Sequence, residues 1–353
     1  MLLASSDEQS SQVGSALMTG GTAPSTSTSS LSSSLSSEPL VRRNYETFDW
    51  KGYKINHRVE GEGPPLLLIH GFGGNVNHFR FQFPALTAAG YRVHAIDLLG
   101  FGASDKPADE PYSIELFVEL LSDYVQSQTR TTTTSTTEST ENGDTDSAKE
   151  QWIVCGNSIG GLCTLGVTQN IPDYVKACVL FNCSGGMSGF QYEDVPLLFR
   201  PLLWPILFFV QKVVLGPQFG GRFFENFKTR ENVETILGGQ VYRDTTNVDE
   251  ELLELILAPS DDEGAQDVFL KVFGGPPGPS PESILPNLKI PILALWGEDD
   301  AWTPLDKGLH PGNKLPEFNK RLELVTIPGA GHCPHDEAPE AVHARMIPWL
   351  AAL

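Results

Sequence analysis

Short apolar runs alternate with helical patterns from about residue 47 to the end of the chain, and this alternation limits the folds open to it. Apolar runs typical of buried strands include Pro65–His70, Tyr91–Leu98, Trp152–Asn157 and Ile290–Gly297. Segments with helical spacing, such as Ile114–Val125, lie between such runs. Strands that alternate with helices form mostly parallel sheets covered by helices on both faces. The pattern therefore predicts an α/β domain around such a sheet.

The same patterns divide the chain into regions. Residues 1–43 are rich in Ser and Thr and predict a disordered tail. Residues 44–184 and 289–353 hold the predicted strands of the core, and the Thr-rich tract at 128–150 predicts a tolerated surface loop within it. Residues 185–288 have helical runs and a Gly/Pro-rich loop. We expect them to form a helical cap inserted after a core strand.

The chain is strongly acidic, with a formal net charge of −20 and a sequence pI near 4.7. Such a surface repels phosphate backbones, so the sequence argues against nucleic-acid binding. It also disfavours electrostatic docking on anionic lipid. Apolar side chains in the predicted cap leave open a peripheral contact with a membrane. The oligomeric state is not indicated.

A serine between glycines gives the clearest chemical signal, in the sequence Gly156-Asn157-Ser158-Ile159-Gly160. It follows an apolar run and precedes a helix-like segment. A sharp strand-to-helix turn needs small residues around its central residue, and it lifts the serine hydroxyl above the edge of the sheet. This context predicts that Ser158 is a nucleophile. The structural alternative is a glycine-bordered N-cap of a helix.

A second glycine-rich loop, Gly71-Phe72-Gly73-Gly74, follows His70 at the end of a predicted strand. In a serine hydrolase such a loop supplies one backbone N–H of an oxyanion hole, and the residue after the nucleophile supplies the other. The expected donors are therefore the amides of Phe72 and Ile159. A phosphate-binding loop is excluded, because neither glycine pattern of such loops is present.

A nucleophilic serine needs a base and an acid that orients the base. His332 follows Gly331 in a small-residue loop after the predicted strand Leu322–Ile327, and we assign it as the base. Glu298, Asp299 and Asp300 all follow an earlier strand. The G-x-x-D spacing favours Asp300, with Asp299 as the alternative. A metal cluster of His332, Cys333, His335 and Asp336 is the alternative, but no further ligand set with zinc spacing is visible, so neither a metal nor a cofactor is expected.

Together these motifs resemble the α/β-hydrolase superfamily from about residue 44 to the end. The segments Asp97–Pro107 and Gly331–Glu337 add to the likeness. The branch looks like the plastid hydrolases of plants and algae that include pheophytinase and chlorophyll dephytylase. The resemblance implies cleavage of the phytol ester of chlorophyll-type pigments and a plastid location, with the cytoplasm as the alternative. Ala301 departs from it, because this branch usually has Pro at that position.

The sequence therefore predicts a serine hydrolase that cleaves a carboxylic ester with a hydrophobic part. Trp204 and Phe208 in the cap and Trp302 after the acid loop are the expected substrate contacts. Two other functions stay open. Carbon–carbon bond hydrolases share the Gly-Asn-Ser turn, and a binding protein could keep the fold without turnover.

Overall fold

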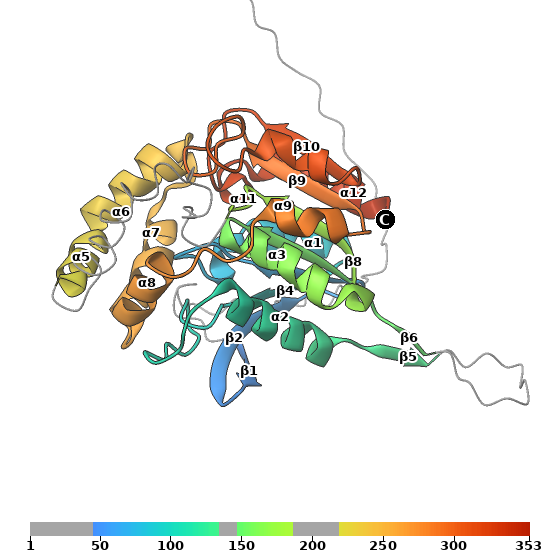
Figure 1. Ribbon diagram of the computed structural model, residues 1–353, viewed down its shortest axis with the longest axis horizontal. Coiled ribbons are helices and arrows are strands. Elements are labelled where there is room, and N and C mark those ends of the chain that lie inside the picture. Colours follow the sequence, from blue (N-terminus) through green and yellow to red (C-terminus); the bar gives the residue numbers. More distant parts are fainter. Residues whose placement is uncertain (1–44, 134–146, 186–218) are drawn as a thin grey trace, which may run out of the picture. The chain divides into compact units, whose positions relative to one another are not determined.

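The computed structural model describes residues 45–133, 147–185 and 219–353, and eight of their strands form one sheet (Figure 1). The strand order is β1-β2-β4-β3-β7-β8-β9-β10. β1 and β2 form an antiparallel hairpin, β2 pairs antiparallel with β4, and the remaining neighbours are parallel. The strands are β1 Glu46–Trp50, β2 Tyr53–Glu60, β3 Pro65–Ile69, β4 Arg92–Ile96, β7 Trp152–Asn157, β8 Val175–Phe181, β9 Ile292–Gly297 and β10 Leu322–Ile327. The predicted fold class is confirmed.

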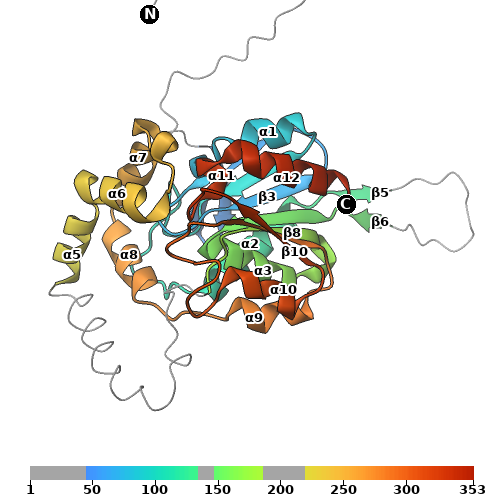
Figure 2. The same ribbon diagram turned by 90° about the horizontal axis from the view of Figure 1, so that it is seen from above.

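Helices cover both faces of the sheet because alternate residues of each strand point to opposite sides. In β3, Leu67 and Ile69 pack with α2 (Ile114–Gln128) and α3 (Ile159–Asn170). The neighbouring residues Leu66 and Leu68 pack with α1 (Gln82–Ala88) and α12 (Pro339–Ala351). Figure 2 shows these two pairs of helices on opposite sides of the strands. Both β3 and β4 are fully buried, and the sequence of β3 (Pro65–Ile69) is continuously apolar, as expected of a buried parallel strand.

The segment between β8 and β9 carries a helical insertion. Its described helices are α5 Gly220–Phe227, α6 Arg230–Ile236, the π-helical turn Leu237–Val241, α7 Glu250–Leu257 and α8 Ala265–Phe273. Figure 1 shows α5 to α8 grouped together, to one side of the layered core. We refer to them as the cap. Trp204 and Phe208 lie outside the described residues, as does the tail at 1–43.

The later part of the predicted cap packs differently. Helix α9 (Pro281–Ile284) contacts α3, and Ile284, Leu285 and Leu288 belong to the same apolar cluster as the core helices. By packing, these residues therefore join the core rather than the cap. The sequence could not indicate this, because a short helical run looks alike in both settings.

Two short strands near the two ends of the Thr-rich tract pair with each other in an antiparallel ladder. β5 (Thr131–Thr133) pairs with β6 (Ser147–Lys149) in a sheet of its own. Threonine is β-branched and favours extended backbone, which accounts for β5; β6 is Ser-Ala-Lys and is extended as the pairing partner of β5. The rest of the tract, residues 134–146, lies outside the described residues.

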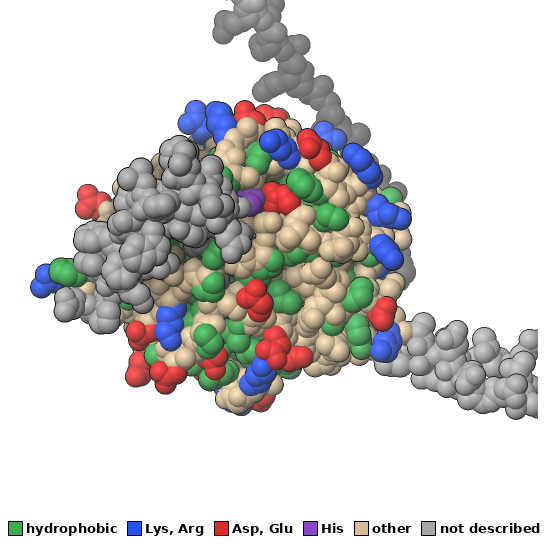
Figure 3. Space-filling view, in the orientation of Figure 1, with side chains coloured by type: hydrophobic (Ala, Val, Ile, Leu, Met, Phe, Trp, Pro, Cys, Tyr) green, Lys and Arg blue, Asp and Glu red, His purple; other side chains and the backbone are tan. Residues whose placement is uncertain are grey.

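Two surface properties bear on partners. On the face in Figure 3, basic side chains lie scattered among acidic ones instead of forming a single stripe. Among residues 45–133, 147–185 and 219–353, no helix has the length and apolar character needed to cross a bilayer.

Candidate active site

Ser158 occupies a strained turn between β7 and α3. Its φ is 56°, a left-handed value that is rare for a residue with a side chain. The flanking glycines make this turn sterically possible. A Cβ at Gly156 would lie 2.1 Å from the carbonyl oxygen of Gly160, and one at Gly160 would lie 2.3 Å from the carbonyl oxygen of Ile69. Backbone strain held by the surrounding packing is common at functional sites.

The loop after β3 packs directly on this turn. A Cβ at Gly71 would lie 3.1 Å from the Cβ of Ser158, a contact tight enough to push the turn by a few tenths of an ångström, so glycine suits this position. His70, at the start of the loop, accepts a hydrogen bond from the amide of Leu98 at 3.0 Å, and its other ring nitrogen contacts the Gly71 carbonyl at 2.7 Å. Ile159 is the first residue of α3, and its N–H therefore has no acceptor within the helix.

The structure brings His332 and Asp300 together after β10 and β9. The distance from His332 Nδ1 to Asp300 Oδ2 is 2.8 Å, and both side chains are buried. Asp299, the alternative acid, is exposed. An ionised carboxylate only accepts hydrogen bonds, so the proton of a neutral His332 ring is on Nδ1. This tautomer leaves Nε2 as the basic nitrogen.

Asp300 is held as an anion although it is buried. Burial by itself would raise its pKa, but the charge of His332 and the hydrogen bonds from His332 and Thr303 outweigh that effect, so the pKa lies well below its usual range. The backbone amides of Trp302 and Thr303 donate to Oδ1 at 2.7 and 3.1 Å. The hydroxyl of Thr303 donates to Oδ2. Asp300 therefore stays ionised and fixed in orientation.

Two asparagines at strand ends hold these residues in place. The Asn157 side chain, next to Ser158, donates to the carbonyl oxygen of His332 at 3.0 Å. The Asn182 side chain donates to Asp300 Oδ2 at 2.6 Å and accepts from the amide of Gly297 at 2.9 Å. The sequence analysis missed both roles, because only folding brings these partners together. The polar side chains that end two apolar runs were the available signal.

The cap is tied to the loop that carries His332. The amide of His332 donates to the carbonyl oxygen of Val241 at 2.7 Å. The carboxylate of Glu337 accepts from three backbone amides, those of Gly331, Arg243 and Asp244, each at 2.6 Å. Cap segment and histidine loop therefore move as one unit unless these bonds break.

A pocket at the junction of cap and core contains Ser158, and we call it the Ser158 pocket. It has about 750 Å³ of empty space, part of it continuous with solvent. Phe72, Ser158, Trp302 and His332 all line it, so the structure brings four predicted site residues to one cavity. Trp302 is 45% exposed, and its ring stacks on that of His332 with the ring centroids 5.8 Å apart. Asp300 does not line the pocket and contacts Nδ1 of His332.

Within the described parts of the chain, no group of three or more His, Cys, Asp or Glu side chains could hold a metal ion.

The fold and the site define a class of enzyme, the hydrolases that carry a strained residue at a strand-to-helix turn. The sequence pattern of the alpha/beta hydrolase family matches residues 66–345. The chain therefore belongs to the alpha/beta hydrolase family, and it is a hydrolase.

Relatives within the family differ in their reactions. The chain is 29% identical over 294 residues to a dihydrolipoyllysine-residue acetyltransferase component of an acetoin cleaving system from Pseudomonas putida, covering 82% of this chain and only 64% of that protein. It is 27% identical to a 2-hydroxy-6-oxononadienedioate/2-hydroxy-6-oxononatrienedioate hydrolase from Paraburkholderia phymatum (84% and 91% covered). It is 26% identical to chloroplastic pheophytinase from Arabidopsis thaliana (90% and 68% covered). Bacterial lipases are also relatives, at 25% identity.

Solved structures agree on the fold. A serine hydrolase involved in carbazole degradation superposes with a TM-score of 0.63 at 21% identity, covering 87% of this chain and 98% of that one. At this identity the likeness concerns the fold alone.

Proposed function

We propose that the chain hydrolyses carboxylic esters through a serine nucleophile. Ser158 is the nucleophile, His332 its general base and Asp300 the residue that orients the base. The amides of Phe72 and Ile159 form the oxyanion hole. No metal or cofactor takes part in this scheme.

The reaction has two halves. Ser158 Oγ attacks the ester carbonyl carbon while Nε2 of His332 takes its proton, and the amides of Phe72 and Ile159 hold the negative charge on the carbonyl oxygen. His332 then gives the proton to the departing alcohol, which leaves an acyl-enzyme. A water molecule, deprotonated by His332, attacks the acyl carbon and releases the acid.

One observation carries this proposal. A serine in a left-handed conformation at the start of a helix lines the same pocket as a histidine whose Nδ1 is 2.8 Å from a buried carboxylate. An N-cap serine without catalytic function would not need either the strain or the histidine. Lipases among the relatives support an ester as the substrate.

Hydrolysis of 4-nitrophenyl acetate and butyrate tests the proposal. Turnover by the purified chain should vanish in Ser158→Ala and in His332→Asn. His343→Asn is the matched control, because His343 is a half-buried residue of α12 that does not line the Ser158 pocket. Turnover that survives Ser158→Ala would overturn the proposal.

Carbon–carbon bond hydrolysis is the second candidate. The Gly-Asn-Ser turn and the relative from Paraburkholderia phymatum favour it. A comparison of aryl esters with vinylogous diketones separates the two reactions. A catalytically silent binding protein would turn over neither class, and a fluorophosphonate would not label it.

The pheophytinase-like branch supports a narrower proposal, in which the ester is the phytol ester of a chlorophyll-type pigment. The support is the motif resemblance together with the 26% identity to the Arabidopsis protein. Release of phytol from pheophytin is its test. A plastid location belongs to this proposal, and a fluorescent fusion in a plant or algal cell would separate it from a cytoplasmic one.

Substrate contacts follow from the same reasoning. We propose that Trp302 contacts substrate, because it lines the Ser158 pocket beside His332. Trp204 and Phe208 remain proposed contacts from the sequence, as does a peripheral contact between cap and membrane. Nucleic acid is not an expected partner of so acidic a chain.

A further inference from the structure

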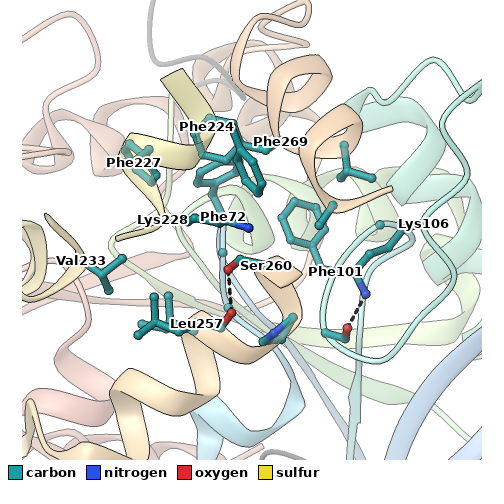
Figure 4. Close-up of a pocket in the computed structure, with 18 residues that line it drawn as sticks. Phe72, Phe101, Lys106, Phe224, Phe227, Lys228, Val233, Leu257, Ser260 and Phe269 are labelled. Atoms are coloured by element: carbon teal, nitrogen blue, oxygen red, sulfur yellow. Dashed lines mark hydrogen bonds between the residues drawn. The ribbon is translucent and has the colours of Figure 1, made fainter. Parts of the chain in front are cut away.

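A second cavity lies beside the Ser158 pocket, and the close-up in Figure 4 shows it. We call it the side pocket. It has about 620 Å³ of empty space, part of it open to solvent. Phe72, Gly73, Gly74, Phe227, Val233 and Ile256 line both cavities, so these residues form a shared wall. The two cavities are therefore directly adjacent at these residues.

The side pocket is built from aromatic side chains of both core and cap. The Phe72 ring lies 5.9 Å from Phe101 of the core and 5.4 Å from Phe269 of α8. Phe227 and Phe224 of α5 lie 4.8 and 5.2 Å from Phe269. Figure 4 shows Phe72, Phe224 and Phe269 close together. Such a lining fits an apolar occupant.

Two lysines line the side pocket, but their charges are already paired. Lys106 Nζ lies 2.8 Å from Asp262 and donates to the carbonyl oxygen of Gly102. Lys228 Nζ lies 2.9 Å from Asp261. An anionic ligand would have to compete with these carboxylates, whereas an alkyl chain would leave both pairs intact. The occupant is therefore apolar.

The position of the side pocket decides which half of an ester it receives. His332 protonates the leaving alcohol, so the alcohol lies on the side of the Ser158 pocket formed by His332, Trp302 and Cys333. None of these three residues lines the side pocket. The acyl group leaves the reacting carbon in a different direction from the alcohol, and Phe72, Gly73 and Gly74 line both cavities on the side away from Trp302 and Cys333.

We propose that the side pocket holds the end of a flexible apolar acyl chain, so that the substrates are fatty-acyl esters of limited chain length. This inference rests on the proposed ester hydrolysis. It competes with the phytol-ester proposal above, because the acyl part of pheophytin is a rigid macrocycle and not a flexible chain.

A series of 4-nitrophenyl esters from acetate to dodecanoate tests the inference. Burial of a methylene contributes about 0.8 kcal/mol, which corresponds to a rise in kcat/KM of about fourfold per added carbon. We expect kcat/KM to rise over several carbons and then to fall when the chain exceeds the side pocket. Alkyl acetates of rising alcohol length should not show this maximum.

Substitutions at Leu257 give a matched pair, because this half-buried residue of α7 lines the side pocket and not the Ser158 pocket. Leu257→Trp fills the side pocket and should lower the octanoate-to-acetate ratio of kcat/KM at least tenfold. Leu257→Ala should move the optimum to longer chains. Ile236→Trp is the control, since half-buried Ile236 lines only the Ser158 pocket, and it should lower both esters and keep their ratio within about threefold. Thermal melting checks that each variant is folded.

The outcomes separate the two proposals. The side pocket is refuted as the acyl site if hydrolysis depends on Ser158 but shows no optimum of acyl length. It is also refuted if both Leu257 variants leave that optimum unchanged. In either case the proposed ester hydrolysis still holds. The absence of any hydrolysis that depends on Ser158 refutes the proposed function, and the acyl site with it.

Discussion

Replacing Asp300 by asparagine should remove most of the activity through a change of tautomer. The backbone amides of Trp302 and Thr303 both donate to Oδ1 and cannot rotate away. They fix the asparagine with its oxygen at that position and its NH₂ group towards His332. The ring must then accept at Nδ1, which places its proton on Nε2. A protonated Nε2 cannot take the proton of Ser158.

The opposite orientation of the asparagine amide, with its NH₂ group at the position of Oδ1, is higher in free energy. It would set the NH₂ group against two backbone donors, whereas the first orientation opposes only one fixed donor, the Asn182 side chain. Each buried donor left without an acceptor costs about 1–3 kcal/mol. The orientation that gives the wrong tautomer is therefore favoured, and the corresponding substitution in a serine protease lowers kcat about 10⁴-fold.

The assay is kcat on 4-nitrophenyl butyrate at pH 7.5, with melting temperature as the check on folding. Asp299→Asn is the control, because Asp299 is adjacent in sequence but exposed. We expect a loss of about 10⁴-fold in Asp300→Asn and less than about threefold in Asp299→Asn. A loss below tenfold at 300, or a larger loss at 299 than at 300, would refute the assignment of the acid.

Three further predictions concern the supporting structure. Asn157→Ala should lower kcat about tenfold with little change in KM, because it removes the hydrogen bond to the carbonyl of His332; steady-state kinetics measures both. Gly160→Ala should lower the free energy of unfolding in urea by about 3 kcal/mol, because its Cβ would overlap a carbonyl oxygen, whereas Gly239→Ala, with no atom within 4 Å, should not. Burial lowers the pKa of His94 to about 3. Below about pH 6.5 the unfolded chain therefore binds a proton at His94 that the native chain does not. His94 alone should contribute about 2–3 kcal/mol to the fall in the free energy of unfolding between pH 6.5 and 4.5, and His94→Asn should lose correspondingly less.

Each of these predictions has a contrary outcome. An unchanged kcat in Asn157→Ala would mean that the loop of His332 is positioned without this bond. Equal stability of the two glycine variants would argue against the close packing at the turn. The same acid loss in His94→Asn as in the unmodified chain would assign the pH dependence to other groups.

The sequence was most informative where one residue must satisfy a local geometry. An apolar run followed by Gly156 and Ser158 predicts both a strand and a sharp turn, because few other structures need that order of residues. The buried parallel strands of the sheet could also be predicted from the sequence, since such strands have continuous apolar sequences. The ladder of β5 and β6 was not predicted, because the low complexity of the tract concealed the β-propensity of Thr131–Thr133, and Ser147–Lys149 has no strand signal of its own.

The rest of the site depends on contacts between distant segments. Glu337 accepts from cap amides about 94 residues earlier in the chain, and no spacing rule encodes that partner. The side pocket likewise combines Phe72, Phe101 and Leu257, which only the packing of cap on core brings together. Composition marked these residues as apolar, but it could not distinguish a filled core from a cavity.

The identity of the nucleophile is the claim on which the whole account depends, and covalent labelling measures it most directly. The chain should gain one phosphonyl group when treated with a fluorophosphonate, and peptide mass spectrometry should locate it on Ser158. Ser158→Ala should stay unlabelled under the same conditions. An unmodified chain, or a label on another residue that persists in Ser158→Ala, would contradict the account.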